Sequence, residues 1–317
     1  MNWHSIYCKD YCLLQEYEFQ LIDSYQLRQE LAGDHSLAIA SIIWHTKDSV
    51  HIKLYLLQQY HEWAHLFSRE QSSKLLEYST FDYGIKLVSG AEVPFGPLYP
   101  VSEQELKALK EWPDKQVETR KIVKSKSSAG APILLVRKSN STYHICVDYW
   151  ALNKVMIKNR YPLPLITELK ERLNKAKIFT KLDLKNSFNL IRMSEENEQK
   201  IAFPTRFGLY HWRVMPFGLC NAPATFQAMM DHIFHDLLDE GVVIYIDDIL
   251  IYSNTEKEHE VLVKEVLARL DKAELALSLH KSYFHTPVIE FLSYIISAEG
   301  IKMTERKVQE VQNWPLS

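Results

Sequence analysis

Short apolar segments of β-branched and aromatic residues alternate along this chain with longer amphipathic stretches. The clearest apolar segment, residues 242–252, reads VVIYIDDILIY and is interrupted only by Asp247 and Asp248. High β-propensity on both sides of two acids predicts a hairpin with Asp247 and Asp248 at its tight turn. Residues 178–184 predict a second strand, which carries Asp183 near its end.

The rest of the pattern predicts a mixture of strands and helices, which indicates an α+β fold with an antiparallel hairpin. Ser102 and Glu105 form a capping-box sequence, and the helix that they open is expected to end before Pro113. The other predicted elements are paired strands at 132–137 and 143–148 with a turn at 139–141, a helix near 164–175, a helix across 223–240 framed by Asn221, Pro223 and Gly241, a helix at 256–276, and a strand at 288–296.

The three acids in these strands predict a divalent metal site. Adjacent carboxylates such as Asp247 and Asp248 repel each other unless a cation lies between them. Two-metal phosphoryl transfer needs acids from at least two segments to hold ions roughly 3.5–4 Å apart. We therefore expect Asp183 and Asp247 to bridge both ions and Asp248 to support them. The alternative for an Asp-Asp pair is a solvated turn, but the apolar flanks and the second acidic strand favour a site.

Composition limits the class of protein. The 317 residues, 46% of them hydrophobic, suffice for one large or two medium domains with a sizeable core. No apolar run approaches the roughly 18–20 residues of a membrane span, and no basic start followed by an apolar stretch predicts a secretory signal. Four scattered cysteines do not form a disulfide scaffold, which fits a reducing compartment.

The net charge of −3 hides a strongly basic block. Residues 1–114 carry a net charge of −7, residues 115–213 of +12, and residues 214–317 of −8. A solvated face is the ordinary explanation for a run of charge. Because this basic block leads into the strand that carries Asp183, we expect it to bind a phosphate backbone.

Several motifs, in their order and spacing, carry a resemblance to a known family. They are PFGPLYP at 94–100, CVDY at 146–149, ALNK at 151–154, KNRYPLP at 158–164, FTKLDL at 179–184, VMPFGL at 214–219, NAPATFQ at 221–227, the 245–252 run, YIIS at 294–297 and Glu299-Gly300. From about Tyr60 to Pro315 the chain resembles the reverse transcriptases of gypsy-type LTR retrotransposons, especially those of fungi.

This resemblance implies a right-hand polymerase fold with an antiparallel palm sheet that carries the Tyr-Ile-Asp-Asp hairpin. Fingers are expected near 115–180 and 205–220, the palm near 181–204 and 221–290, and only the start of a thumb. The expected domain organisation is an N-terminal segment 1–58 without assigned function, a protease-to-polymerase connecting region 59–114 with a linker, and fingers and palm at 115–317, ending before the thumb, connection and RNase H regions.

The resemblance also assigns roles to individual residues. Those expected at the incoming nucleotide are Arg137, Lys138, His144, Leu184, Phe188, Phe217 and Gly218. Those expected at the template and primer are Tyr245, Leu292, Ser293, Lys158 and Arg160. Phe188 would lie under the sugar and exclude a 2′-hydroxyl by its size, although periodicity alone favours an ordinary core phenylalanine.

The function implied is that of an RNA-directed DNA polymerase within a Gag-Pol polyprotein. It would use two Mg²⁺ ions, with Mn²⁺ as a substitute, and would bind an RNA template, a DNA primer and dNTPs. Its expected location is a cytoplasmic virus-like particle or the nucleus, with no membrane partner. The alternative is a decayed copy that only binds nucleic acid, because His144 and Trp150 replace family arginines, Ser293 replaces a glycine, and Pro204 interrupts a strand.

One further motif predicts different chemistry. His61-Glu62-Trp63-Ala64-His65 matches the pattern of zinc proteases, in which two histidines lie one helical turn apart beside a glutamate base. The same stretch resembles an amphipathic helix of the retrotransposon family, with Trp63 on its apolar side. A zinc hydrolase is therefore the third hypothesis, and stoichiometric zinc in the purified protein would support it.

Overall fold

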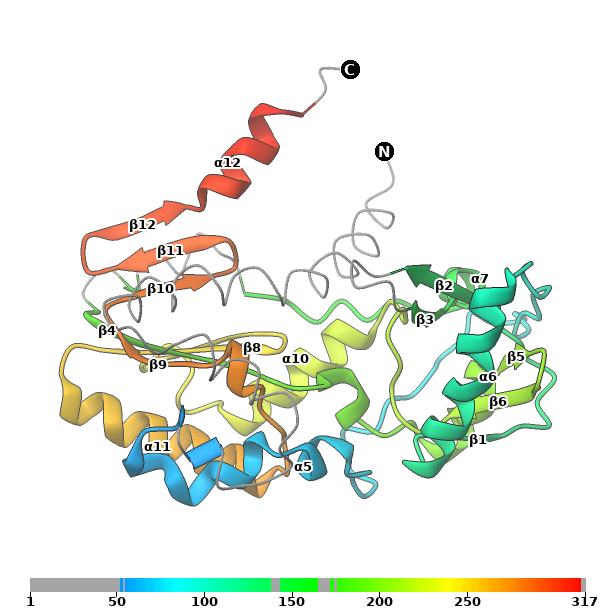
Figure 1. Ribbon diagram of the computed structural model, residues 1–317, viewed down its shortest axis with the longest axis horizontal. Coiled ribbons are helices and arrows are strands. Elements are labelled where there is room, and N and C mark those ends of the chain that lie inside the picture. Colours follow the sequence, from blue (N-terminus) through cyan, green and yellow to red (C-terminus); the bar gives the residue numbers. More distant parts are fainter. Residues whose placement is uncertain (1–51, 54, 138–142, 165–171, 174–175, 315–317) are drawn as a thin grey trace. The chain divides into compact units, whose positions relative to one another are not determined.

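The computed structural model describes residues 52–53, 55–137, 143–164, 172–173 and 176–314 (Figure 1). The described chain divides into two compact units. Unit 1 contains Glu77–Ile157 and Arg192–Ala222, and unit 2 contains Ile52–Leu76, Lys158–Ile191 and the chain from Pro223 onward. The polypeptide therefore crosses between the units repeatedly, and each unit is built from segments that are distant in sequence.

Unit 1 contains a small antiparallel sheet and a separate hairpin. The sheet has the strand order β1-β6-β5, formed by β1 (Ile122–Lys124), β6 (Gly208–Trp212) and β5 (Phe203–Thr205). The hairpin pairs β2 (Ile133–Arg137) with β3 (Tyr143–Val147), which confirms the predicted pairing, while its turn lies outside the described residues. The helical elements of unit 1 are α6 (Glu103–Glu118), α7 (Trp150–Val155), α9 (Glu195–Glu198) and η4 (Gln199–Ile201).

Two prolines of unit 1, Pro113 and Pro204, lie inside regular secondary structure. The capping box of Ser102 and Glu105 opens α6 as predicted, but the helix continues through Pro113 instead of ending before it, so that part of the prediction is wrong. Pro113 is buried on the packed side of α6, and such packing offsets the hydrogen bond that the ring removes. Pro204 lies in β5 at the edge of the sheet, where a missing donor is tolerated.

Unit 2 is built on a four-stranded antiparallel sheet with the order β7-β8-β4-β9. Its strands are β4 (Ile178–Asp183), β7 (Val242–Tyr245), β8 (Asp248–Ser253) and β9 (Tyr283–Thr286). The helical elements of the unit are η2 (Gln58–Phe67), α5 (Arg69–Ser73), η3 (Ser187–Leu190), α10 (Ala222–Ile233), α11 (Glu256–Lys272), η5 (Leu279–Lys281) and α12 (Glu305–Gln312).

Alternation along β4 divides its side chains between two faces of the sheet. Phe179 lies in an apolar cluster that joins this sheet to β10 (Val288–Phe291) and β11 (Tyr294–Ser297). Lys181 and Asp183 point to the same face as Phe179. Thr180 and Leu182, both fully buried, point to the opposite face. The acidic end of β4 therefore lies on the face that packs against the second sheet of the unit.

A buried polar network covers the opposite face, beside α11. The ring of His259, which is fully buried, bonds through Nε2 to Thr180 Oγ1 at 2.7 Å and through Nδ1 to Ser253 Oγ at 3.0 Å. Burial, with a further contribution from His285, lowers the pKa of His259 to about 4. His285 in turn bonds to the hydroxyl of Tyr60 in η2 at 2.6 Å, so this network joins η2 to the sheet.

The second sheet of unit 2 corrects the prediction of one strand at 288–296. The chain instead forms a meander of β10 (Val288–Phe291), β11 (Tyr294–Ser297) and β12 (Gly300–Met303). Leu292 and Ser293 form the turn between β10 and β11, with φ angles of 51° and 65°. Tight hairpin turns need such left-handed residues, but neither leucine nor serine signals one in the sequence, so the apolar run resembles a single strand.

The helix expected across 223–240 is shorter than predicted, because α10 ends at Ile233 and turns fill 234–241. Gly241 then has a φ of 104°, and a Cβ there would lie 2.5 Å from Leu262 Cδ2.

The predicted helix at 256–276 is confirmed as α11, whereas most of the one near 164–175 lies outside the described residues. Within the described chain, no helix is long and apolar enough to cross a membrane.

Replacing Ser293 by glycine should stabilise the protein. A side chain in the left-handed region is strained, and glycine removes that strain. We expect Ser293→Gly to raise the free energy of unfolding by roughly 0.5–1 kcal/mol in urea titrations. Ala298→Gly, an exposed turn position without a positive φ, is the matched control and should destabilise. A loss of stability in Ser293→Gly would contradict the strained turn.

Candidate active site

The pairing register of unit 2 brings two of the three predicted acids face to face. Asp183, the last residue of β4, pairs with Asp248, the first residue of β8. Tyr245 pairs with Asp248 across the hairpin, so Ile246 and Asp247 form the turn between β7 and β8. The prediction that both acids lie in the turn is therefore corrected for Asp248, which belongs to the strand.

The turn is held by backbone hydrogen bonds to two neighbouring elements. The carbonyl of Asp247 accepts a bond of 3.0 Å from the N–H of Leu184, and the N–H of Ile246 donates to Gln227 Oε1 at 2.7 Å. Ile246 has a φ of 56°, which is rare for a β-branched residue. Strained backbone of this kind is found preferentially at functional sites, where the surroundings hold it in place.

Burial is the main influence on the ionisation of Asp183. It raises the pKa of Asp183 to about 7, an effect opposed by Lys281 and Lys181 and reinforced by Asp248 and Asp247. Two carboxylates on one buried face cannot both ionise cheaply without a cation. The site therefore favours any positive charge that lies between them.

Lys181 supplies one such charge. Its Nζ lies 3.0 Å from Asp248 Oδ1, and both side chains are mostly buried. Burial disfavours the ammonium form, but the attraction of Asp248, together with that of Asp183 and Glu290, raises the pKa of Lys181 overall. The sequence motifs predict no role for Lys181, although its place two residues before Asp183 on an alternating strand puts both side chains on the same face.

The donor set fits a hard divalent cation that keeps most of its water or phosphate ligands. Asp183, Asp247 and Asp248 offer only carboxylate oxygens, which Mg²⁺ prefers. Among the described residues, however, no three His, Cys, Asp or Glu side chains converge as a metal cluster. Asp248 is paired with Lys181 instead. A metal ion bound by Asp248 would therefore compete with the ammonium group of Lys181.

The other predicted residues of unit 2 lie in varied surroundings. Leu184 is buried and reaches the site through its backbone bond to Asp247. Phe188 is 4% exposed and packs edge-on against Phe226, with ring centroids 5.8 Å apart. These are also the surroundings of an ordinary core phenylalanine, which the periodicity of the sequence favours. Tyr245 and Leu292 pack against the apolar cluster between the two sheets.

Three further residues predicted at the template or primer lie at the surface of unit 2. Ser293 is exposed in the turn between β10 and β11, where its carbonyl accepts a bond from the N–H of Thr304. Lys158 and Arg160 are exposed in a segment without regular structure. Exposed basic side chains are of the kind that contact a phosphate backbone.

The predicted residues of unit 1 do not gather on one face of the hairpin of β2 and β3. Arg137 pairs with Tyr143 and His144 pairs with Val136, so Arg137 and His144 point to opposite sides of the two strands. Lys138 lies outside the described residues.

Phe217 and Gly218 belong to the loop that follows β6. Gly218 has a φ of 94°, and a Cβ there would lie 3.4 Å from the carbonyl oxygen of Val147. Its carbonyl accepts a bond of 2.7 Å from Asn153 Nδ2. The conformation and these neighbours within the chain already account for a glycine at this position.

The zinc-protease pattern is not assembled as a metal site in the described chain. η2 is a 3₁₀ helix, which changes the spacing that the pattern requires. His61 bonds to the carbonyl of Leu56, and His65 bonds to Asp271 at 2.7 Å and to the carbonyl of Glu62. The two rings therefore serve separate contacts that anchor η2.

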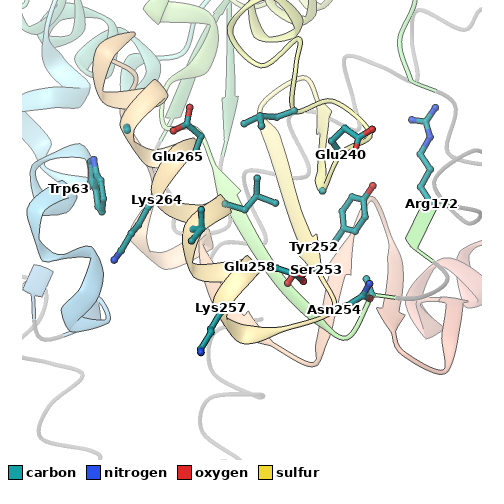
Figure 2. A pocket seen from close by; sticks show the side chains of 16 residues that line it. Trp63, Arg172, Glu240, Tyr252, Ser253, Asn254, Lys257, Glu258, Lys264 and Glu265 are labelled. Carbon is teal, nitrogen blue, oxygen red and sulfur yellow. The ribbon is translucent and has the colours of Figure 1, made fainter.

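A groove beside α11 is lined by residues of both charges and by exposed apolar side chains (Figure 2). Those labelled include Trp63, Arg172, Tyr252, Lys257 and Glu265. None of the residues predicted to bind metal, nucleotide or nucleic acid lines this groove. We therefore place the candidate active site at the acidic ends of β4 and β8 and not in the groove.

Comparison with known families agrees with the motifs. The model of the family described as reverse transcriptase (RNA-dependent DNA polymerase) matches residues 136–296. The Transposon Tf2-3 polyprotein of Schizosaccharomyces pombe is 37% identical over 216 residues, and the Tf2-7 polyprotein is 36% identical over the same length. Each alignment covers 68% of this chain but only 16% of the polyprotein, so the chain spans about one sixth of these relatives.

Solved structures show the same fold. The foamy viral protease-reverse transcriptase in complex with an RNA/DNA hybrid aligns with a TM-score of 0.71 at 21% identity, over 84% of this chain and 36% of that one. The same enzyme in a form bound to double-stranded DNA aligns with a TM-score of 0.69 at 18% identity, over 88% and 52%. The predicted right-hand polymerase fold is thereby confirmed.

Removing the charge of Asp183 should stabilise the metal-free protein in a pH-dependent way. Because its folded pKa is raised from 3.8 to about 7, ionising it destabilises the fold progressively as pH rises through that window. We expect Asp183→Asn to raise the melting temperature in EDTA by on the order of 5 °C at pH 8, and by much less at pH 4.

The exposed Asp114→Asn is the control for this measurement and should show no such trend. Added Mg²⁺ should stabilise the parent more than Asp183→Asn, since the ion offsets the same repulsion. An equal gain at both pH values would refute the assignment of Asp183 as a buried, destabilising carboxylate.

Proposed function

This chain belongs to the reverse transcriptase (RNA-dependent DNA polymerase) family, and we propose that it is the polymerase portion of a retrotransposon polyprotein, copying an RNA template into DNA. The observation that carries the proposal is the register that pairs Asp183 with Asp248 and puts Asp247 in the adjoining turn. Acids from two separate strands are what two-metal nucleotidyl transfer requires.

In this proposal each acid keeps the role that the sequence suggested. Asp183 and Asp247 hold the divalent ions, and Asp248, released from Lys181, supports them. Bound Mg²⁺ or Mn²⁺ would favour ionisation of the primer 3′-hydroxyl and neutralise the leaving pyrophosphate. After that release, Lys181 stays beside the acids and limits their net negative charge.

In this proposal, basic residues bind the nucleic acid and the nucleotide, and the family resemblance assigns each of them its contact. Lys158 and Arg160 are exposed and contact the template or primer backbone. Arg137, at the end of β2, contacts the triphosphate of the incoming dNTP. The remaining parts of the polyprotein and a virus-like particle complete the proposed setting, as the relatives are polyproteins.

A second candidate function is nucleic acid binding without synthesis. It is favoured by His144 and Trp150, which stand where the resemblance expects arginines. Trp150 is 55% exposed, and Lys154 Nζ lies 4.2 Å from the centroid of its ring, so this position keeps an aromatic and cationic surface. Such a protein would bind template with a steep salt dependence but would need neither Mg²⁺ nor dNTP.

Replacing Asp247 by asparagine should abolish synthesis. Asp247→Asn keeps the shape of the turn but removes the charge that holds the ions, so primer extension on an RNA template with dNTPs and Mg²⁺ should fall by at least ~10³-fold. Template affinity should stay within about twofold.

The control is Asp114→Asn, which should extend primers like the parent. Near-normal extension by Asp247→Asn would refute the metal assignment. Salt-sensitive binding without extension by the parent would instead favour the binding-only function.

A separate measurement decides between the two interpretations of Phe188. If the ring excludes a 2′-hydroxyl, Phe188→Val should raise the use of rNTP relative to dNTP by at least ~10-fold. The control is Phe226→Leu, which loosens the same aromatic pair without shortening residue 188. Equal changes in nucleotide preference in both variants would assign Phe188 to core packing alone.

A further inference from the structure

The turn that carries Asp247 is fixed from behind by the side chain of Gln227. This glutamine lies on α10 and is fully buried. Its Oε1 accepts the N–H of Ile246 at 2.7 Å, and its Nε2 donates to Asp231 Oδ1 at 2.8 Å and to the carbonyl of Ile244 at 3.2 Å. Every polar group of the amide therefore has a partner, two of them in the catalytic hairpin.

Chemistry determines which way this amide points. The carboxylate of Asp231 and the carbonyl of Ile244 can only accept hydrogen bonds, so the NH₂ group of Gln227 must face them. That leaves Oε1 facing the N–H of Ile246. Asp231 thus selects the one orientation of Gln227 in which the turn receives an acceptor.

Tyr161 fixes the carboxylate in turn. Its hydroxyl donates to Asp231 Oδ2 at 2.7 Å, so both carboxylate oxygens are engaged. This hydrogen bond, together with burial, raises the pKa of Tyr161 to about 12, so the phenol remains a donor at physiological pH. A continuous chain of hydrogen bonds therefore runs from Tyr161 through Asp231 and Gln227 to the turn.

The turn needs such support because its backbone is unfavourable. Ile246 combines a φ of 56° with a β-branched side chain and is 3% exposed. Left unbonded, its buried N–H would lack a partner and the residue could relax toward an ordinary conformation. Any relaxation moves the adjacent Asp247, and displacements of about 1 Å at reacting groups can cost 10²-fold in rate.

We propose that Tyr161, Asp231 and Gln227 are positioning residues that hold the Ile246–Asp247 turn in its metal-binding conformation. The proposal rests on the polymerase function proposed above. Tyr161 directly follows Arg160, so the same chain ties the basic segment expected at the template to the catalytic turn. None of the three side chains needs to touch substrate.

The first test is steady-state primer extension with Gln227→Met, which keeps the length of the side chain but removes its polar groups. We expect kcat to fall by roughly 10–100-fold, with KM for dNTP and template affinity within about twofold, and the Mg²⁺ concentration for half-maximal rate to rise. Gln71→Met removes a comparable bond, to the carbonyl of Glu274, and should leave all three quantities unchanged.

A double-mutant cycle tests whether the three residues act as one chain. Tyr161→Phe should lower kcat by about threefold alone and add nothing in the Gln227→Met background, since residues of one network are not additive. Asp231→Leu should resemble Gln227→Met. Asp231→Asn should keep most of the parental rate that Asp231→Leu loses. The Oδ1 of the asparagine can still accept a hydrogen bond from Gln227, while its NH₂ group donates to the hydroxyl oxygen of Tyr161. Additive losses, or no rescue by Asp231→Asn, would overturn the proposal.

Amide hydrogen exchange at Ile246, measured by NMR on metal-free protein, needs no activity. Exchange at Ile246 should be at least ~10-fold faster in Gln227→Met than in the parent, with the core of α11 unchanged. A parent that neither extends primers nor binds Mg²⁺ would refute the proposed function while exchange still tests this inference. Unchanged protection at Ile246 would refute the inference even in a fully active enzyme.

Discussion

The cross-strand pairing of Asp183 with Asp248 is the constraint on which the rest of unit 2 depends. Two carboxylates are placed on one face of the sheet, at the end of strands that are mostly apolar along their length. Burial, with a further contribution from the neighbouring carboxylates, raises the pKa of Asp183, and Lys181 pairs with Asp248. The fold tolerates these buried charges only if packing elsewhere offsets the stability that they cost.

That packing comes from both faces of the sheet. On one face, Phe179 and Leu250 join the apolar cluster with the meander of β10 to β12. On the other, α11 and η2 cover the strands, and the network of His259 satisfies the buried hydroxyl of Thr180. Strand β4 is therefore held along its length, so that its acidic end can remain electrostatically unfavourable without unfolding.

The turn between β7 and β8 illustrates the same principle on a smaller scale. Ile246 takes a left-handed backbone that glycine would adopt more easily. The structure compensates with bonds from Gln227 and Leu184, which lie far from the turn in sequence. Strain at Ile246 and support from α10 are two parts of one arrangement, and both serve the position of Asp247.

The sequence alone identified the family and predicted the main elements around the candidate site. Local patterns suffice where one strand or one capping box decides the outcome, as for β2 and β3, the start of α6, and the apolar strands around Asp183 and Asp247. The ordered set of motifs also identified the family and thereby the fold. These features depend on residue type and spacing along the chain, which the sequence contains directly.

Only the tertiary structure decided the features that depend on contacts between distant segments. Packing lets α6 continue through Pro113, and two left-handed residues divide the run 288–296 into two strands. The register of β4 against β8 places Asp248 in a strand and brings in Lys181. Gln227 lies 19 residues before the turn that it supports. No local pattern reveals these pairings, because the hydrogen bonds and burial that favour them exist only after the chain has folded.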